Sequence, residues 1–236
     1  MLISLLIAAI FSISFFIESI VGFGGGLIAY SMLGFFMDIK KMIILGLYIG
    51  SCSSAYIFIT DHKSFSKKIF MNSLPICLLG SMIGALIFSN IDSQTMLTLF
   101  GAFSIILSAK VIFFDNIKFP ALFQNLLLLI GGISTGLFGI GGPFIVNALK
   151  DTFKGKSELR STMAAIFVAM SVARATQLSL QGEISFATLE NSWWVIIPVL
   201  AAIYFGYKLH LHISEVFFKK LVGAMTLFAG IVFLFK

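Results

Sequence analysis

Eight long apolar runs, separated by short polar connectors, make up almost the whole sequence. A helix needs about 20 mostly apolar residues to cross the hydrocarbon core of a bilayer. Only 11% of the residues are charged, against roughly 25% in a soluble domain, so the chain has too few charges to cover a surface that faces water. The sequence therefore predicts an all-α polytopic membrane protein with about eight transmembrane segments. The runs cover residues 2–37, 42–60, 69–89, 94–114, 120–149, 159–181, 189–208 and 214–235.

The first and fifth of these runs are too long for one straight span, and both contain a glycine cluster. Ten of the 21 glycines lie in residues 22–26 and 131–142. Because every backbone N–H and C=O group needs a partner within lipid, an interruption of this kind is tolerated at membrane depth only where it is buried in protein or lines a wet cavity. We therefore expect each run to form a helix that is broken at its glycine-rich loop.

The two glycine clusters lie at matching places in a duplicated sequence. Residues 21–29, VGFGGGLIA, align with residues 138–146, FGIGGPFIV, at a shift of 117. The sequence thus predicts a single membrane domain built from two homologous repeats, residues 1–115 and 116–236. Paired interruptions at corresponding positions of two repeats are typical of the binding site of a secondary transporter. Further matched pairs, with one gap, are Pro75 with Pro198, Gly84 with Gly206, and Gly101 with Gly223.

The residues after each interruption begin a new half-helix, and the first N–H groups of that half-helix lack intrahelical partners and carry partial positive charge. Glycine allows a ligand to approach this backbone closely, and Pro143 fits the first turn of a helix. Two such helix ends near the membrane midplane favour the binding of an anion. Close packing of helices is the alternative role of these glycines. The candidate anion-binding residues in the two loops are Gly22, Gly24, Gly25, Gly26, Gly139, Gly141, Gly142 and Pro143.

The repeated motif resembles that of a known family. The stretches GFGGGLIA, residues 22–29, and GLFGIGGPFIV, residues 136–146, are similar to the hallmark of the sulfite exporter TauE/SafE family, also called toluene sulfonate uptake permeases. Pro75 and Pro198 fit the third span of each half, and QGEISF, residues 181–186, is similar to the turn after the sixth span. The resemblance covers essentially the whole chain. It implies a transporter of small, often sulfur-containing anions, such as sulfite, sulfonates or sulfoacetate, in the cell (inner) membrane.

Arg174 lies about two-thirds of the way along the sixth run. A charged residue near the centre of a membrane helix costs about 2.5–3.5 kcal/mol on insertion scales, so such a residue normally faces protein or water. A guanidinium binds oxyanions through two parallel hydrogen bonds, and Gln177 lies on the same helix face. We expect Arg174 and Gln177 to contact the anion. Structural pairing of Arg174 with Glu18 or Glu183, and snorkelling to the interface, are the alternatives.

Glu18 precedes the first glycine cluster by four residues, where the family pattern usually carries a small or apolar residue. A carboxyl group inside a membrane span is suited to carry a proton, so Glu18 is the candidate coupling residue. Pairing with Arg174 and simple exposure at the interface are the alternatives for Glu18. Three other polar residues are candidates for contact with the solute, namely Ser51 and Ser53 in the second run and Asn147 one turn after the second interruption.

Two topologies compete for this sequence. If the broken runs each cross the membrane once, the chain has eight spans and parallel halves. If they are re-entrant, each half has three spans and the halves are inverted. The excess of Lys and Arg in cytoplasmic loops favours the inverted arrangement, whereas the family resemblance favours eight spans. Both arrangements place the N- and C-termini outside.

Chemistry other than transport has little support in the sequence. Cys52 and Cys77 lie in different runs, and the sequence has no CxxC motif and no His/Cys cluster, so we expect no metal, cofactor or enzyme activity. The net charge of +6 comes from short basic clusters between apolar runs, which are typical of membrane orientation and lipid contact rather than of nucleic-acid binding. The N-terminal run lacks a basic segment and a cleavage site, and we interpret it as a retained span.

The sequence as a whole therefore predicts a secondary transporter of small anions, with proton coupling through Glu18 left open. An anion channel, or a uniporter-like exporter without ion coupling, is the alternative. The expected partners are the anionic solute and membrane lipid. A homo-oligomer is compatible with the sequence.

Overall fold

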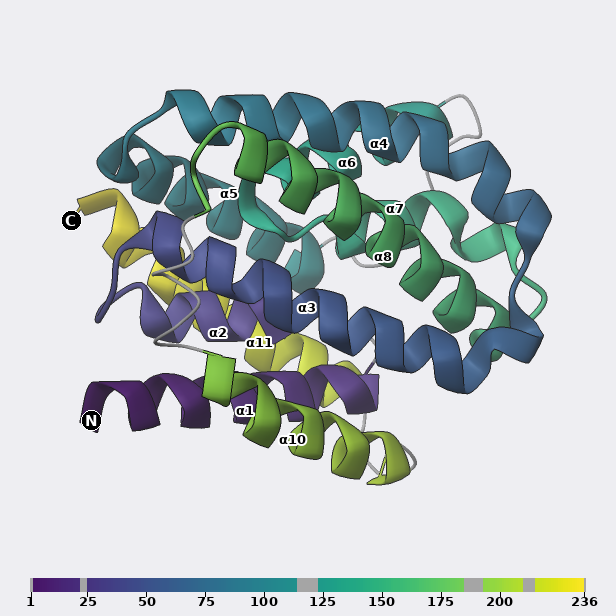
Figure 1. Ribbon diagram of the computed structural model, residues 1–236, viewed down its shortest axis with the longest axis horizontal. Helices are drawn as coiled ribbons and strands as arrows, with labels where there is room; N and C mark the ends of the chain where they lie inside the picture. The colour runs from purple at the N-terminus through teal and green to yellow at the C-terminus, as the bar shows by residue number, and fades with distance from the viewer. Residues whose placement is uncertain (1, 22–24, 114–122, 185–192, 210–214, 236) are drawn as a thin grey trace. The chain divides into compact units, whose positions relative to one another are not determined.

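The computed structural model describes residues 2–21, 25–113, 123–184, 193–209 and 215–235, which are mainly helical (Figure 1). These residues form ten α-helices and three short 3-10 helices, and they contain no strand, which confirms the all-α class. The helices are α1 (Leu2–Val21), α2 (Gly25–Leu33), α3 (Ile39–Asp61), α4 (Lys67–Asn90), α5 (Ser93–Phe113), α6 (Gln124–Phe138), α7 (Gly142–Leu149), α8 (Lys156–Leu180), α10 (Ile196–Leu209) and α11 (Glu215–Phe235).

Two of these helices, α2 and α7, are short and follow a longer helix across a glycine-rich interruption. The helix of the fifth run ends at Phe138 and resumes at Gly142, where the sequence predicts a break. In the first run, α1 ends at Val21 and α2 begins at Gly25. Gly22 and Gly24 lie outside the described residues.

The chain forms two compact units, each assembled from several segments. The first unit contains Met1–Leu45, Ile91–Lys118 and Ala187–Lys236, and the second contains Gly46–Asn90 and Phe119–Phe186. The units therefore do not coincide with the two halves of the sequence. Each unit combines helices from both sides of the predicted repeat boundary near residue 115.

In the second unit, α4 and α6 pack with their backbones in close contact. Gly80 and Gly84 of α4 face Gly132 and Gly136 of α6, and a Cβ atom on either α4 glycine would lie only 2.9 Å from the Cα atom of the opposite glycine. Any larger side chain at these positions would force the helices apart. Helices in membranes associate through such small residues, so part of the second glycine cluster serves close packing.

In the first unit, the matching contact joins α1 and α10. A side chain on Gly206 of α10 would collide with the backbone oxygen of Phe16 and the hydroxyl group of Ser19, both on α1. Gly206 aligns with Gly84 in the predicted duplication, and α1 is the counterpart of α6. The two contacts thus involve helices at matching places of the predicted duplication. The duplication itself stays a prediction.

The same unit contains a second glycine crossing, between α5 and α11. A Cβ atom on Gly101 would lie 2.9 Å from the backbone oxygen of Gly230, and one on Gly230 would lie 2.8 Å from the backbone oxygen of Gly101. Beside this crossing, the ring of Phe100 packs against those of Tyr30 and Phe233. The helix α2 that follows the first interruption is thereby held against α5 and α11.

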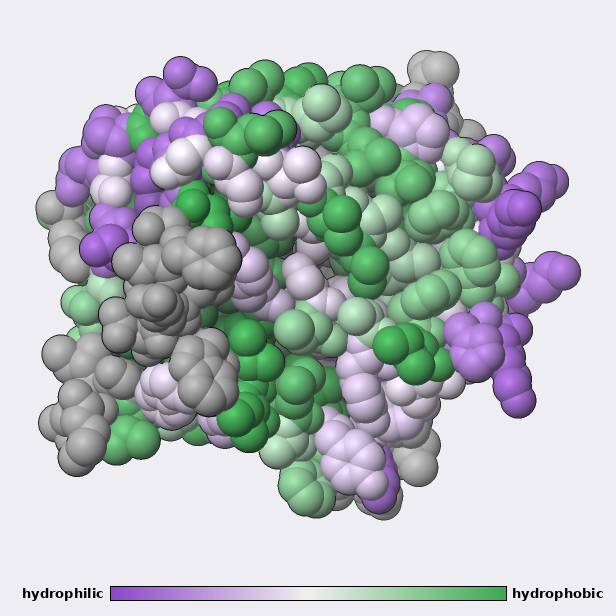
Figure 2. Space-filling model, in the orientation of Figure 1, coloured by the Kyte–Doolittle hydropathy of each residue, from purple (hydrophilic) through white to green (hydrophobic). Residues whose placement is uncertain are grey.

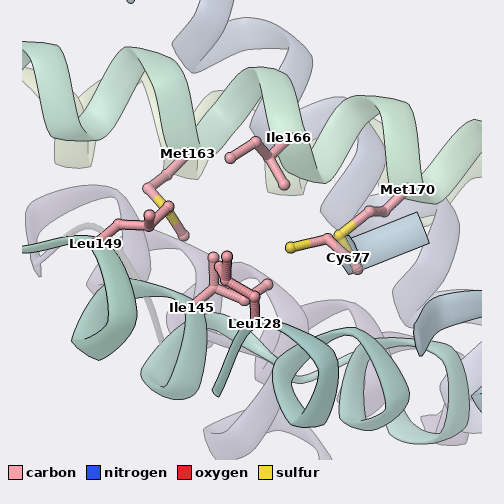
Figure 3. Packing of buried hydrophobic residues seen from close by; sticks show 7 residues of the cluster. All are labelled: Cys77, Leu128, Ile145, Leu149, Met163, Ile166 and Met170. Atoms are coloured by element: carbon pink, nitrogen blue, oxygen red, sulfur yellow. The ribbon is translucent and has the colours of Figure 1, made fainter. Parts of the chain in front are cut away.

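The half-helix α7 is held in the second unit by apolar packing (Figure 3). Side chains of α7 and α8 point toward one another, with one residue each from α4 and α6 beside them. This packing joins α7 to α4, α6 and α8 through Ile145 and Leu149. The cluster consists of Cys77, Leu128, Ile145, Leu149, Met163, Ile166 and Met170.

Three helical stretches among the described residues are long and apolar enough to cross a membrane, namely Ile39–Ser64, Lys67–Asn90 and Ser157–Leu180. Four shorter apolar helices accompany them. Large apolar side chains are exposed on several helices, including Ile106 at 66% and Leu180 at 85%. Figure 2 shows apolar residues across much of one face. Such exposure is unusual for a soluble protein and fits contact with lipid.

Candidate functional site

The break between α6 and α7 begins with a tightly turned helix end. Gly139 has a φ of 76°, a left-handed conformation, and its N–H group donates to the oxygen of Thr135 at 2.8 Å. The bond from Gly139 to Thr135 is the one that defines the αL type of helix ending, and the N–H group of Ile140 donates in addition to the oxygen of Ser134. A residue with a Cβ atom is strained in this conformation, so Gly139 defines where α6 stops.

The new helix begins at Gly142, three residues after Gly139. The N–H groups of Phe144 and Ile145 both donate to the oxygen of Gly141 at 3.1 Å, so Gly141 caps the start of α7. Pro143 is the second residue of the helix, within the first turn that the sequence predicts for it. Because Pro143 has no N–H group, Gly142 is the residue among 142–145 that can offer its N–H group to a ligand.

Gly141 is also the point at which the break packs back onto α6. A side chain at this position would collide with the backbone oxygen of Gly131 and the hydroxyl group of Thr135. The Thr135 hydroxyl group donates to the oxygen of Gly131 at 2.8 Å. The second glycine cluster therefore has two roles, since Gly132 and Gly136 allow helix packing while Gly139 and Gly141 form the break.

Arg174 of α8 lies at this break. Its side chain is 1% exposed, and its Nη2 atom donates to the backbone oxygen of Leu137 at 3.4 Å. Leu137 belongs to the last turn of α6, whose carbonyl groups have no partner within the helix. The guanidinium also lies over the ring of Phe88 of α4, 5.6 Å from its centroid. The structure thus brings together two features that the sequence singled out separately, the buried arginine and the second interruption.

This position excludes one of the three roles that the sequence left open for Arg174. Full burial is incompatible with snorkelling to the interface. Contact with the end of α6 identifies a structural role that the sequence did not suggest, the capping of a helix C-terminus by a cation. Contact with an anion, and pairing with Glu18 or Glu183, stay predictions.

Gln177, one turn after Arg174, is tied to α4. Its Nε2 atom donates to the backbone oxygen of Met82 at 3.1 Å, while its Oε1 atom is buried and has no hydrogen-bond partner among the described residues. One turn farther on, Gln181 accepts a hydrogen bond from the hydroxyl group of Ser89 at 2.6 Å. These contacts fix the face of α8 that carries Arg174 against α4.

Glu18 makes a contact of a different kind in the first unit. Its Oε2 atom accepts a hydrogen bond from the N–H group of Gly25 at 2.7 Å. Gly25 is the first residue of α2, so the carboxylate is bound to the start of the helix that follows the first interruption. The sequence did not suggest this contact. A role of Glu18 in proton coupling stays a prediction.

The remaining candidates lie on helices of the second unit, apart from Gly26 near the start of α2. Ser51 donates its hydroxyl group to the oxygen of Leu47 within α3, and Ser53 is buried on the same helix. Asn147 is half-buried on α7. The part of these residues in binding stays a prediction.

No group of three or more His, Cys, Asp or Glu side chains that could hold a metal ion occurs among the described residues. Cys52 and Cys77 are both free thiols, and Cys77 belongs to the apolar cluster around α7. Arg160, at the other end of α8 from Arg174, forms an ion pair with Asp61 at 3.5 Å.

Long apolar helices, a half-helix that begins at a glycine-rich break and a buried arginine at that break are the features of a polytopic membrane protein. The model of the sulfite exporter TauE/SafE family matches residues 6–233, and the chain therefore belongs to this family. Neither a curated protein nor a solved structure matches the chain. The family consists of transporters rather than enzymes, and it points to a membrane exporter of sulfite or another anion.

Proposed function

We propose that the protein is a secondary transporter that moves small sulfur-containing anions across the cell (inner) membrane, and that the anion binds at the break between α6 and α7. One observation carries the proposal: the guanidinium of Arg174 is buried at this break, in hydrogen-bond contact with the last turn of α6. Family membership gives the class of solute, and the break gives the place where an anion would be stabilised.

Two sources of positive charge act at this break. The start of α7 carries the positive end of a helix dipole, with the N–H group of Gly142 at its first residue. Arg174 adds a full charge whose planar fork of donors matches the oxygens of sulfite and sulfonate groups. Coulomb interactions are stronger in protein than in water because the effective dielectric constant is lower. An oxyanion is therefore the ligand that these groups favour, and Gln177 and Asn147 would provide further polar contacts.

Energetics set the direction in which such a transporter works without coupling. Moving one charge through 100 mV is worth roughly 2.3 kcal/mol. A divalent anion therefore leaves a cell with a negative interior with about 4.6 kcal/mol of help per 100 mV, so export needs no coupling ion. Uptake of the same anion needs at least two protons to cancel its charge. This asymmetry favours export as the activity, in agreement with the family.

The function is tested by solute flux into liposomes that contain the purified protein. The panel comprises sulfite, sulfate, thiosulfate, sulfonates, sulfoacetate and small carboxylates. We expect saturable flux of at least one sulfur oxyanion, accelerated by the same anion on the opposite side. Non-saturating flux without this acceleration would favour a channel, and absence of flux for every anion would overturn the proposal.

Proton coupling is examined in the same liposomes with a pH gradient. If the proton moves through Glu18, the Glu18→Gln variant loses pH-driven flux while exchange of the anion down its own gradient survives. If Glu18 serves only as a structural ligand of α2, the effect of the pH gradient is the same in both proteins.

A further inference from the structure

The two interruptions differ in charge at one equivalent pair of positions. In the first unit, Glu18 lies one turn before the end of α1, and its carboxylate binds the N–H group of Gly25, the first residue of α2. At the shift of 117 that aligns the two motifs, Glu18 corresponds to Thr135 and Gly25 corresponds to Gly142. Gly142 is the first residue of α7. The comparison is therefore between the same position of two related breaks.

Thr135 provides no negative charge to the second break. Its hydroxyl group donates to the oxygen of Gly131, one turn earlier on its own helix. At the second break, the hydroxyl group of Thr135 therefore bonds back to its own helix, α6. At the equivalent position of the first break, the carboxylate of Glu18 binds the helix that follows. This difference follows from the side chains alone, because a threonine has neither the length nor the charge of a glutamate.

We propose that the carboxylate of Glu18 is an internal ligand of the first break, and that it occupies the place at the start of α2 that a small carboxylate or other oxyanion would otherwise take. The binding of the transported solute then falls to the second break alone. The statement about the transported solute rests on the proposed function. The statement that Glu18 occupies the start of α2 rests only on its hydrogen bond with Gly25.

The local geometry supports an internal ligand. A hydrogen bond from a backbone N–H group to a carboxylate is charge-assisted, and the positive end of the helix dipole adds to it. A Cβ atom on Gly25 would lie 2.7 Å from Oε2 and 2.9 Å from Cβ of Glu18. Glycine at this position therefore allows the carboxylate to approach the helix start. An incoming oxyanion cannot bind the same N–H group while Glu18 does.

Chemical rescue tests the inference. Replacing Glu18 by Ala removes the carboxylate and leaves space for a small one beside the N–H group of Gly25. We expect the Glu18→Ala variant to melt at a lower temperature than the wild type, and sodium formate to raise its melting temperature saturably. At a formate concentration ten times its dissociation constant, the folding equilibrium gains a factor of about 11. The wild type should show no such shift, because its own carboxylate fills the place.

Glu18→Thr provides a second variant that copies the residue of the second break, which keeps the test decisive if Glu18→Ala fails to fold. Formamide, which has the shape of formate without its charge, should stabilise neither variant. Phe11→Ala removes a buried side chain on the same helix and should be destabilised without any rescue. These controls separate refilling of the carboxylate place from general effects of solute on a weakened protein.

Equal formate shifts in the wild type and the Glu18 variants would overturn the inference, as would the absence of a shift in both variants. Neither result bears on the anion flux of the wild type or on its dependence on Arg174. The failure of this inference is therefore distinguishable from the failure of the proposed function.

Discussion

The guanidinium of Arg174 lies over the ring of Phe88, with its central carbon 5.6 Å from the ring centroid. The arginine comes from α8 and the phenylalanine from α4, and both side chains are at most 1% exposed. The same guanidinium reaches the end of α6 through Leu137. Three helices of the second unit therefore determine where this charge lies, so its position depends on residues that need not touch a solute.

Phe88→Leu tests this positioning role. Leucine keeps an apolar side chain beside Arg174 but removes the aromatic face, which is worth about 2 kcal/mol when such a pair is shielded from water. We expect the apparent affinity for the transported anion to fall by up to about 30-fold, while maximal flux through the folded protein is maintained. Phe100→Leu, at an equally buried position in the first unit, serves as the control. An unchanged affinity in Phe88→Leu would show that the ring does not hold Arg174 for binding.

Gly84→Ala tests the close contact between α4 and α6. A methyl group there would overlap the backbone of α6 beside Gly136, and overpacking of this kind costs about 1–3 kcal/mol. Gly50→Ala is the matched control, because a Cβ atom on Gly50 of α3 would meet nothing within 4 Å. In a thermal denaturation experiment we expect a clear loss of stability for Gly84→Ala and none for Gly50→Ala. Equal stability of the two variants would be inconsistent with the contact.

Gly139→Ala tests the helix ending at the second break. Gly139 has a φ of 76°, and a left-handed conformation costs a residue with a Cβ atom about 1–2 kcal/mol. Gly182, at the end of α8, has a φ of 75° and empty space around it, so Gly182→Ala introduces the same strain elsewhere. We expect a similar loss of stability in both variants but weaker anion binding in Gly139→Ala only. Equal affinities in the two variants would place the solute away from this break.

The Asp92 cap of α5 leads to a prediction about pH. The backbone N–H group and the hydroxyl group of Thr95, with the N–H group of Gln94, donate to this carboxylate, and the pKa of Asp92 is lowered below its ordinary value of 3.8. Because hydrogen bonds to the charged form lower the folded-state pKa, the stabilisation is present above pH 3.8 and is lost as the pH falls through the lowered pKa.

The matched variant for this cap is Asp92→Asn, which keeps the shape of the side chain and removes its charge. We expect the wild type to melt at a higher temperature than Asp92→Asn at neutral pH, and the difference to shrink as the pH falls below about 4. Melting temperatures recorded across this range provide the check. A difference that is constant down to the lowest pH would mean that the charge of Asp92 contributes nothing.

Much of the second break could be predicted from the sequence. Glycine and proline have strong backbone preferences, so the end of α6 near Gly139 and the start of α7 before Pro143 follow from residue type alone. The burial of Arg174 was also predictable, because an unshielded charge in a membrane helix is costly. These features depend on local chemistry, which a single sequence contains.

The partners of these residues could not be predicted in the same way. In a membrane helix, residues that face lipid and residues that face protein are both apolar, so the pattern does not show which face packs. The close contact of Gly84 with α6 and the ring beneath Arg174 therefore had no clear signal. The bond between Glu18 and Gly25 depends on how the chain turns at the first break, and the composition of the motif does not determine that turn.

The most direct test of the central claim is the apparent affinity of the transported anion for Arg174→Lys in liposomes. Lysine keeps the charge at the end of α6 but loses the planar fork, so the loss of one charge-assisted hydrogen bond should weaken affinity by about 10- to 150-fold. Arg160, on the same helix as Arg174, forms an ion pair with Asp61 of α3. The Arg160→Lys variant makes the same exchange there and should bind the anion as the wild type does. If Arg174→Lys, shown to be folded by its melting curve, binds and transports the anion like the wild type, the break at Arg174 is not the binding site.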